Sequence, residues 1–306
     1  MRVVVLAGGT GGAKLAAGMQ DHLGPDLSVV ANTADDVDHL GVYVSPDPDL
    51  VTYWLAGVID EDQGWGIAGD TFTVFERLVS LGAPDWFGLG DRDLATCLWR
   101  RERLDAGERP TEVQAQVTQA LGVRAGVLPM SDQPVRTRIR TEGGWLSLQE
   151  YLVREHAKPE VREVALDGID GARPSPEVLA AIADADAIVI GPSNPVISIE
   201  PILAVPGMRD AIAAAGAPVV AVSPYVGGRI LKGPTDGLMR ATGREPNTSG
   251  VASAYEGVAT AIVVDAGDAG RPPEGLSVRT VPTLMDTAAA RREVAGAVLE
   301  FARELG

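Results

Sequence analysis

A short β-branched run at the start of the chain, Arg2–Ala7, leads directly into a glycine-rich turn at residues 8–14. A buried apolar run followed at once by glycines is typical of a parallel strand that turns tightly into a helix. Glycine lets the backbone adopt positive φ and approach a ligand closely, and the first N–H groups of a helix have no intrahelical partner. The opening therefore predicts an α/β fold with a site for phosphate oxygens. The residues predicted to contact a nucleotide there are Gly8, Gly9, Thr10, Gly11, Gly12 and Lys14.

This turn differs from both of the well-known phosphate-binding motifs. A Walker loop needs glycine before its lysine and serine or threonine after it, whereas Ala13 and Leu15 flank Lys14. The third glycine of the dinucleotide fingerprint is also missing, because Lys14 stands at its position. The second predicted strand, Leu27–Ala31, ends in Asn32 rather than in the acidic residue that would hold a ribose. The pattern favours phosphate binding over classical NAD binding, and a glycine turn that only joins strand to helix remains the alternative.

Apolar segments alternate along the rest of the chain and predict a Rossmann-like α/β fold, a mostly parallel sheet with flanking helices. With 306 residues and 45% apolar content, we expect a single α/β domain over residues 1–306, with a helix-rich inserted lobe at roughly 60–160. Periodicity predicts helices at Leu50–Val58, Thr71–Leu81, Leu94–Leu104, Thr111–Leu121 and Asp286–Leu305. It also predicts a hairpin from Val135–Arg140 and Trp145–Leu148, and strands at Ala187–Ile190, Pro218–Val222 and Ala261–Asp265.

Composition limits the partners of the protein. With 26 basic and 42 acidic residues the net charge is −16, which repels nucleic acid, so we expect no nucleic-acid partner. No run approaches the roughly 18 apolar residues of a membrane span, and the first strand begins too early for a signal peptide. The single cysteine, Cys97, excludes an internal disulfide and fits a cytoplasmic protein. Lysine is scarce, so the positive charge of Lys14 inside the glycine turn stands out as a phosphate contact.

An aspartate-rich segment, Asn32–Asp49, follows the second strand and is predicted to be a loop. Its carboxylates are Asp35, Asp36, Asp38, Asp47 and Asp49. Carboxylate oxygens beside a phosphate site are the ligands that Mg²⁺ prefers, and the metal would neutralise charge on a transferring phosphoryl group. A solvated acidic loop is the alternative. Pro46 and Pro48 argue against it, because they stiffen the segment more than a solvated loop requires.

The turn at Gly8 and the loops at Asn32 and Gly191 each follow a predicted strand, so we expect them to face one crevice at the carboxyl ends of the strands. Arg92 lies in a second glycine-rich turn, where it would bind a phosphate or a planar ligand, or form a surface ion pair. Motifs for covalent serine catalysis and for zinc are absent from the sequence. Positioning, metal and electrostatics remain, as in phosphoryl transfer.

Taken in order, these motifs resemble the 2-phospho-L-lactate transferase family of coenzyme F420 biosynthesis, which includes bacterial phosphoenolpyruvate transferases. The resemblance spans nearly the whole chain, and it departs from the family at Pro48-Asp49-Leu50, where the usual residues are Leu-Asp-Thr. The segments that carry it are Gly8–Gly11, Asn32–Asp36, Ser45–Asp49, Trp65–Ile67, Asp70–Phe72, Leu89–Asp93, Leu128–Asp132, Gly191–Pro195, Val222–Pro224 and Gly233–Pro234.

The resemblance implies a reaction. A guanosine-diphosphate-activated acid, lactyl-2-diphospho-5′-guanosine or its enolpyruvyl counterpart, gives its phospho-acid group to the ribityl hydroxyl of the deazaflavin Fo (7,8-didemethyl-8-hydroxy-5-deazariboflavin), and GMP leaves. A nucleotide-dependent oxidoreductase and a non-catalytic deazaflavin- or nucleotide-binding protein are the alternatives. Homodimers are common among such folds.

The resemblance also implies residue roles. Fo would lie near Asp49 and Arg92, and Asp35 and Asp49 would hold Mg²⁺ and act as the catalytic carboxylates. The guanine nucleotide would lie along the first glycine turn and against Asn32, Ser193 and Asn194. We expect on this basis that Asp49→Ala loses most turnover while the melting temperature hardly changes.

Overall fold

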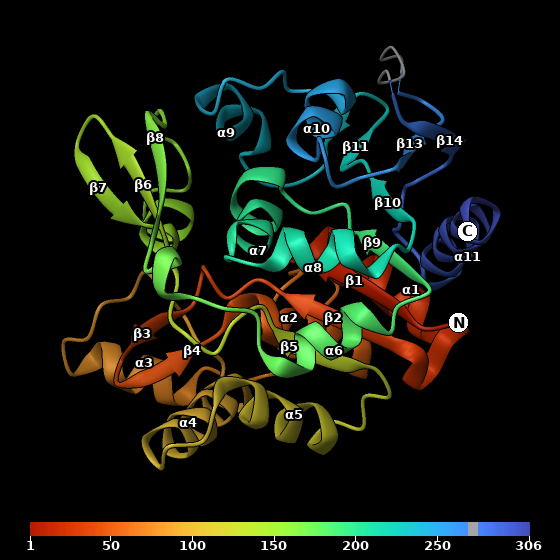
Figure 1. Cartoon of the computed structure of the whole chain (residues 1–306). Coiled ribbons are helices and arrows are strands. Elements are labelled where there is room, and N and C mark those ends of the chain that lie inside the picture. Colours follow the sequence, from red (N-terminus) through yellow and green to blue (C-terminus); the bar gives the residue numbers. More distant parts are fainter. Residues whose placement is uncertain (269–274) are drawn as a thin grey trace.

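A seven-stranded, all-parallel sheet forms the centre of the molecule (Figure 1). The computed structural model describes residues 1–268 and 275–306. The strand order is β14-β13-β10-β9-β1-β2-β5, so β1 is flanked by β9 and β2. The strands are β1 (Val3–Ala7), β2 (Leu27–Ala31), β5 (Gly126–Pro129), β9 (Ala187–Ile190), β10 (Val219–Val222), β13 (Ala261–Asp265) and β14 (Ser277–Val281). This architecture confirms the predicted Rossmann-like α/β fold.

Helices cover both faces of the central sheet. Side chains in a strand alternate between the two faces, and in β1 Val3 and Val5 pack on one side while Val4 and Leu6 pack on the other. The first side is covered by α1 (Gly9–Leu23), α2 (Pro46–Ala56) and α11 (Ala288–Leu305), and the second by α6 (Pro176–Ala183), α7 (Glu200–Ala204) and α8 (Met208–Ala215). Because both faces are buried, the inner strands are continuous apolar runs rather than alternating ones.

Most of the predicted strands are confirmed. Leu27–Ala31, Ala187–Ile190 and Ala261–Asp265 have the predicted bounds, and β10 begins one residue late. The predicted hairpin consists of β6 (Arg136–Thr141) and β7 (Gly144–Ser147), to which β8 (Glu163–Asp167) adds a third antiparallel strand. The edge strands β5 and β14 were not among the predicted elements.

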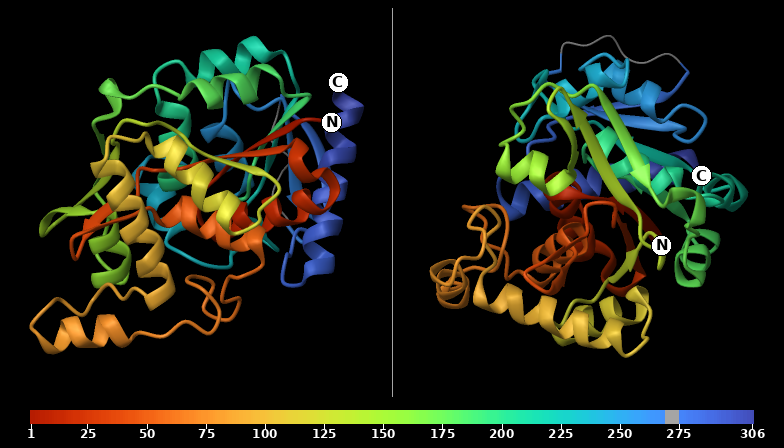
Figure 2. Two further views of the ribbon diagram at one scale, coloured as in Figure 1. Left: turned by 90° about the horizontal axis from the view of Figure 1, so that it is seen from below. Right: turned by 90° about the vertical axis from the view of Figure 1, so that its left-hand side faces the viewer.

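Residues 60–160 contain α3 (Thr73–Ser80), α4 (Asp91–Asp105) and α5 (Pro110–Ala120), close to the helices expected there. The helix α3 buries none of its residues and projects from the body of the molecule (Figure 2). The same stretch includes β5, which pairs with β2, so it contributes directly to the central sheet. The C-terminal helix α11 begins two residues later than expected, where the Thr287 side chain accepts a hydrogen bond from the Ala290 N–H group.

The segment Asn32–Asp49 is not the loop that the sequence predicted. Strands β3 (Val37–His39) and β4 (Val42–Val44) form a short hairpin, and α2 begins directly afterwards at Pro46. Proline suits the first position of a helix, because its fixed φ is helical and the missing N–H group would have no partner there. The proline that we interpreted as stiffening a loop therefore starts a helix.

Three smaller elements complete the upper part of Figure 1: the two-stranded hairpin of β11 (Tyr225–Val226) and β12 (Arg229–Ile230), and the helices α9 (Thr235–Ala241) and α10 (Thr248–Ala254). A short turn of helix, Pro195–Ile199, precedes α7. Among residues 1–268 and 275–306, no helix combines the length and the apolar character needed to cross a membrane.

Candidate active site

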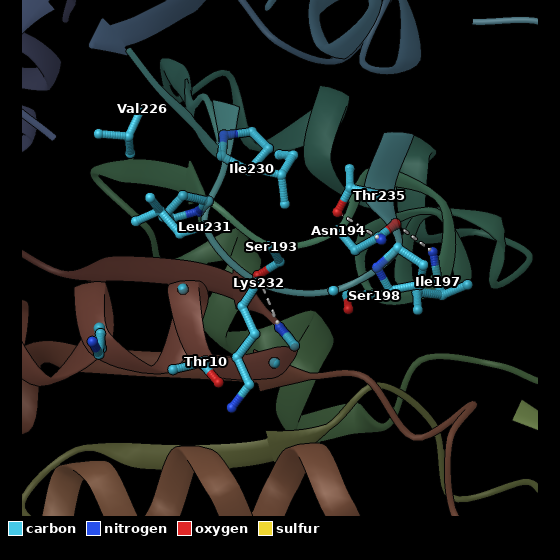
Figure 3. Close-up of a pocket in the computed structure, with 18 of the residues that line it drawn as sticks. Thr10, Ser193, Asn194, Ile197, Ser198, Val226, Ile230, Leu231, Lys232 and Thr235 are labelled. Atoms are coloured by element: carbon cyan, nitrogen blue, oxygen red, sulfur yellow. Dashed lines mark hydrogen bonds between the residues drawn. The ribbon is translucent and has the colours of Figure 1, made fainter. Parts of the chain in front are cut away.

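A cavity of about 940 Å³ opens at the carboxyl edge of the central sheet. Its walls come from the segments that follow β1, β9, β10 and β14, together with residues around Leu148 and His156 (Figure 3). Asp35 and Asp47, from the segment after β2, also line it. Parallel strands end at the same edge, so five separate loops meet here, and the size suits a small-molecule ligand. The structure thus brings the turn at Gly8 and the loop at Gly191 to one cavity.

Hydrogen bonds and close packing with neighbouring segments fix the conformation of the glycine turn. The Gly8 N–H group donates to Ser193 Oγ at 3.2 Å, and the Gly9 N–H group donates to Asp47 Oδ1 at 2.5 Å. Gly9 has a φ of +63°, in the left-handed region that favours glycine. At Gly11, a Cβ atom would overlap the carbonyl oxygen of Pro192. The turn therefore needs glycine for packing. Thr10 and Gly11 lie in the first turn of α1, where N–H groups lack intrahelical partners.

Replacing Gly11 with alanine should destabilise the protein by about 3 kcal/mol or more, the upper end of the cost of overpacking, because the backbone of Pro192 cannot move aside like a side chain. Gly237, inside α9, is the control: a Cβ there meets no atom within 4 Å, so Gly237→Ala should be neutral or stabilise by up to about 1 kcal/mol. Urea unfolding of both variants measures the difference. Equal stabilities would show that the turn relaxes around the added methyl group.

Two carboxylates and one amide form a buried polar cluster beside the turn. The Asn32 side chain donates through Nδ2 to Asp47 Oδ2 at 2.9 Å and, more weakly, to Asp35 Oδ1 at 3.5 Å. Asn32 is fully buried behind the cavity wall, whereas Asp35 and Asp47 line the cavity. Asn32 therefore orients the two carboxylates from behind.

The electrostatics of this cluster favour a bound cation. Burial raises the pKa of Asp35 well above its usual range, and the charges of Asp47 and Asp36 raise it further. Burial also raises the pKa of Asp47 to about 6, against hydrogen bonds from Asn32 and Gly9, and the pKa of Asp36 to about 7. Among the described residues, no basic side chain forms an ion pair with any of these three carboxylates. Two carboxylates that repel each other at a cavity wall are a donor set that fits a hard divalent cation.

Asp49, the other predicted metal ligand, does not reach the cavity. It lies two residues after Asp47 in α2, and residues two apart on a helix point to different sides. Its carboxylate instead forms an ion pair with Arg100 of α4, and each side chain is only 5% exposed. Asp93 and Cys97 lie close enough to Asp49 to form a three-ligand cluster, but Arg100 already supplies the positive charge there. The structure therefore pairs Asp35 with Asp47 rather than with Asp49.

Arg92, the other predicted Fo contact, also lies outside this cavity. It is exposed in the first turn of α4, where its guanidinium donates to the Ala68 carbonyl at 3.3 Å. Ser193 and Asn194 do line the cavity, but the side chain of Asn194 is hydrogen-bonded to other residues of the protein. It accepts from two N–H groups of the turn Pro195–Ile199, and its Nδ2 donates to Thr235 Oγ1 at 3.0 Å.

Lys14 lines the cavity one helical turn beyond Thr10. Its ammonium lies 5.3 Å from the centre of the Trp54 ring, a cation–π contact. Burial lowers the pKa of Lys14, and the nearby charge of Arg291 lowers it further. Lys232, from the segment after β12, lines the same cavity and was not predicted. The scarcity of lysine that drew attention to Lys14 is the signal that would have found it.

A parallel sheet whose strand-end loops enclose one cavity defines an α/β protein of the Rossmann-like class. The sequence profile described as 2-phospho-L-lactate transferase CofD matches residues 3–293, so the chain belongs to this family and is a transferase. It is 43% identical to a phosphoenolpyruvate transferase of Kitasatospora aureofaciens, over all of this chain and 99% of that protein. It is 37% identical to a 2-phospho-L-lactate transferase of Methanosarcina mazei, over 97% of this chain and 99% of that protein.

Solved structures agree on the fold. A member of the UPF0052 family from Bacillus halodurans superposes with a TM-score of 0.64 at 20% identity, covering 97% of this chain and 98% of that one. At this identity the likeness concerns the fold alone.

Proposed function

We propose that this protein transfers a phospho-acid group from its guanosine-diphosphate-activated form to the ribityl hydroxyl of the deazaflavin Fo, releasing GMP. Membership of the CofD family supports this reaction. The higher identity to a phosphoenolpyruvate transferase than to a 2-phospho-L-lactate transferase favours the enolpyruvyl acid. The observation that carries the proposal is the single cavity shared by the first glycine turn and the carboxylates of Asp35 and Asp47.

The residues of the cavity divide the work of such a transfer. The N–H groups of Thr10 and Gly11, in the first turn of α1, would bind phosphate oxygens, aided by the positive end of the helix dipole. Asp35 and Asp47 would hold Mg²⁺, which when bound would neutralise the charge on the transferring phosphoryl group. Asn32 keeps both carboxylates oriented. Since positioning and charge stabilisation account for most of phosphoryl transfer, no covalent nucleophile is required.

The test is direct. The protein incubated with Fo, the enolpyruvyl- or lactyl-activated GDP compound and Mg²⁺ should release GMP, measured by chromatography. Removal of divalent cations with EDTA should reduce GMP release to the level without enzyme, and added Mg²⁺ should restore it. Folded protein that binds Fo or GDP but releases no GMP would instead indicate a non-catalytic binding protein. Release that continues unchanged in EDTA would exclude the metal site while leaving the transfer intact.

A further inference from the structure

A short arm, residues 225–234, forms the wall of the cavity opposite the first glycine turn. It begins with the hairpin β11–β12, whose two-residue turn consists of Gly227 and Gly228, both with positive φ. The chain then runs through Leu231 and Lys232 to Gly233, which also has positive φ. Leu231 is 65% exposed, so apolar burial does not hold this end of the arm against the body of the protein.

The arm is held at two points by polar contacts. At its hairpin turn, Asp265 Oδ1 accepts a hydrogen bond from the Gly227 N–H group at 2.9 Å, while Oδ2 accepts from the Thr283 N–H group at 2.8 Å. At the far end, Lys232 Nζ donates to the main-chain carbonyl of Gln63 at 3.2 Å. The arm therefore spans the cavity and sets the position of the Lys232 ammonium.

Lys232 and Lys14 bring two positive charges to one cavity. They are two of only three lysines in a chain of net charge −16. Figure 3 shows the Lys232 side chain extending from the arm toward Thr10, and Lys14 stands one turn further along the same helix. Across the part of the chain that the structure describes, neither ammonium lies within ion-pairing distance of a carboxylate.

Burial and the charges of Arg291 and Lys232 lower the pKa of Lys14. The charges of Glu61 and Asp286 raise that pKa, and Arg291 itself is paired with Glu61 at 2.9 Å. The two lysine ammonium groups repel each other, and a bound anion would relieve that repulsion. Although the protein has 42 acidic residues, neither of the two lysine ammonium groups forms an ion pair with a carboxylate among residues 1–268 and 275–306. Lysine binds phosphate well as a compact point charge. The cavity lining thus includes both carboxylates and two lysine ammonium groups.

We propose that Lys232 is a diphosphate-binding residue, which reaches across the cavity on the glycine-flanked arm and holds the diphosphate of the nucleotide together with Lys14. This assignment rests on the proposed function, because it takes the ligand to be a nucleoside diphosphate. On binding, the ammonium of Lys232 exchanges its hydrogen bond with the Gln63 carbonyl for phosphate oxygens. The arm then covers the diphosphate from the side opposite α1.

The experiment measures the affinity of purified full-length protein for GDP, GMP and guanosine by calorimetry. Lys232→Met should weaken GDP binding about 10- to 100-fold, the range for losing one hydrogen bond to a charged group. GMP binding should weaken less, and guanosine binding should stay within about twofold of wild type. Lys232→Arg keeps the charge and should recover most of the GDP affinity. Lys158→Met, which removes the one lysine outside the cavity, is the matched control and should leave all three affinities unchanged.

The results distinguish a failure of the Lys232 assignment from a failure of the proposed function. If Lys232→Met binds GDP as tightly as wild type, the assignment of Lys232 is wrong and the proposed function is unaffected. If guanosine binding falls as much as GDP binding, the arm acts by packing and the assignment is also wrong. If wild-type protein binds no GDP, the proposed function itself fails, and this inference fails with it. Thermal unfolding of each variant verifies folding, and Lys232→Gln provides a second neutral substitution of an exposed residue.

Discussion

Asp35→Asn should lose turnover by about 10²-fold or more, because the change removes a metal ligand worth about 3 kcal/mol or more to the transition state. Its melting temperature should stay unchanged or rise. The folded protein gains from the same change, since burial and the charges of Asp47 and Asp36 disfavour the Asp35 carboxylate. The hydrogen bond from Asn32 to Asp35 Oδ1 is weak, at 3.5 Å, and offsets little of this cost. Activity and stability thus move in opposite directions, as is common where function requires an unfavourable charge.

The pH dependence gives this prediction a second readout. The raised pKa of Asp35 means that the folded wild-type protein takes up its proton at a higher pH than the unfolded chain does. The stability advantage of Asp35→Asn should therefore be largest at alkaline pH and shrink as the pH falls. Asp38→Asn, which removes an exposed charge from the same segment, is the control and should keep nearly full turnover. A large fall in the melting temperature of Asp35→Asn would instead make Asp35 a structural residue.

Arg100→Met should destabilise the protein by about 3–5 kcal/mol, because it leaves the Asp49 carboxylate buried without its partner. Burial already raises the pKa of Asp49, against the attraction of Arg100, and its Oδ2 atom has no hydrogen-bond partner among the described residues. The same reasoning reverses the expectation for Asp49→Ala that the sequence suggested. Removing that carboxylate leaves a buried guanidinium, so we now expect a large loss of stability.

Two further variants isolate the ion pair in urea unfolding. The double variant Arg100→Met with Asp49→Asn removes both charges and should be more stable than Arg100→Met alone, because no buried charge is left without a partner. Arg101→Met, at the neighbouring position, breaks a partly exposed pair with Asp38 and should cost no more than about 1 kcal/mol. If Arg100→Met and Arg101→Met cost the same, the buried pair contributes nothing beyond a surface pair.

The inner strands were predictable because they are buried on both faces. Ala187–Ile190 and Ala261–Asp265 are uninterrupted apolar runs, and their bounds are correct. The edge strand β14 mixes Ser277, Arg279 and Thr280 with its valines, since only part of it is covered, and a pattern this short resembles a loop. The other edge strand, β5, is four residues long and ends in a proline.

The segments that form the candidate site were predictable from the sequence, but the pairing of Asp35 with Asp47 was not. That Gly8 and Asp35 lie at one edge of the sheet follows from the rule that parallel strands end together. The choice of Asp49 over Asp47 followed from the resemblance and from treating Ser45–Asp49 as a loop, in which neighbouring carboxylates are free to converge. With Ser45 as the N-cap of a helix, Asp47 and Asp49 have different directions, and only the first faces α1.

The order of the central sheet has a consequence for synthesis on the ribosome. β1 is completed first, but its neighbour β9 and the carbonyl of Pro192 that Gly11 packs against emerge only near residue 190. At about 5–20 residues per second, the edge of β1 remains unpaired for roughly 10–40 s before β9 is synthesised. During that interval the residues of the first glycine turn have been synthesised, but the turn lacks its contacts with Pro192 and Ser193. Ligand binding by this turn is therefore a property that the chain acquires late in translation.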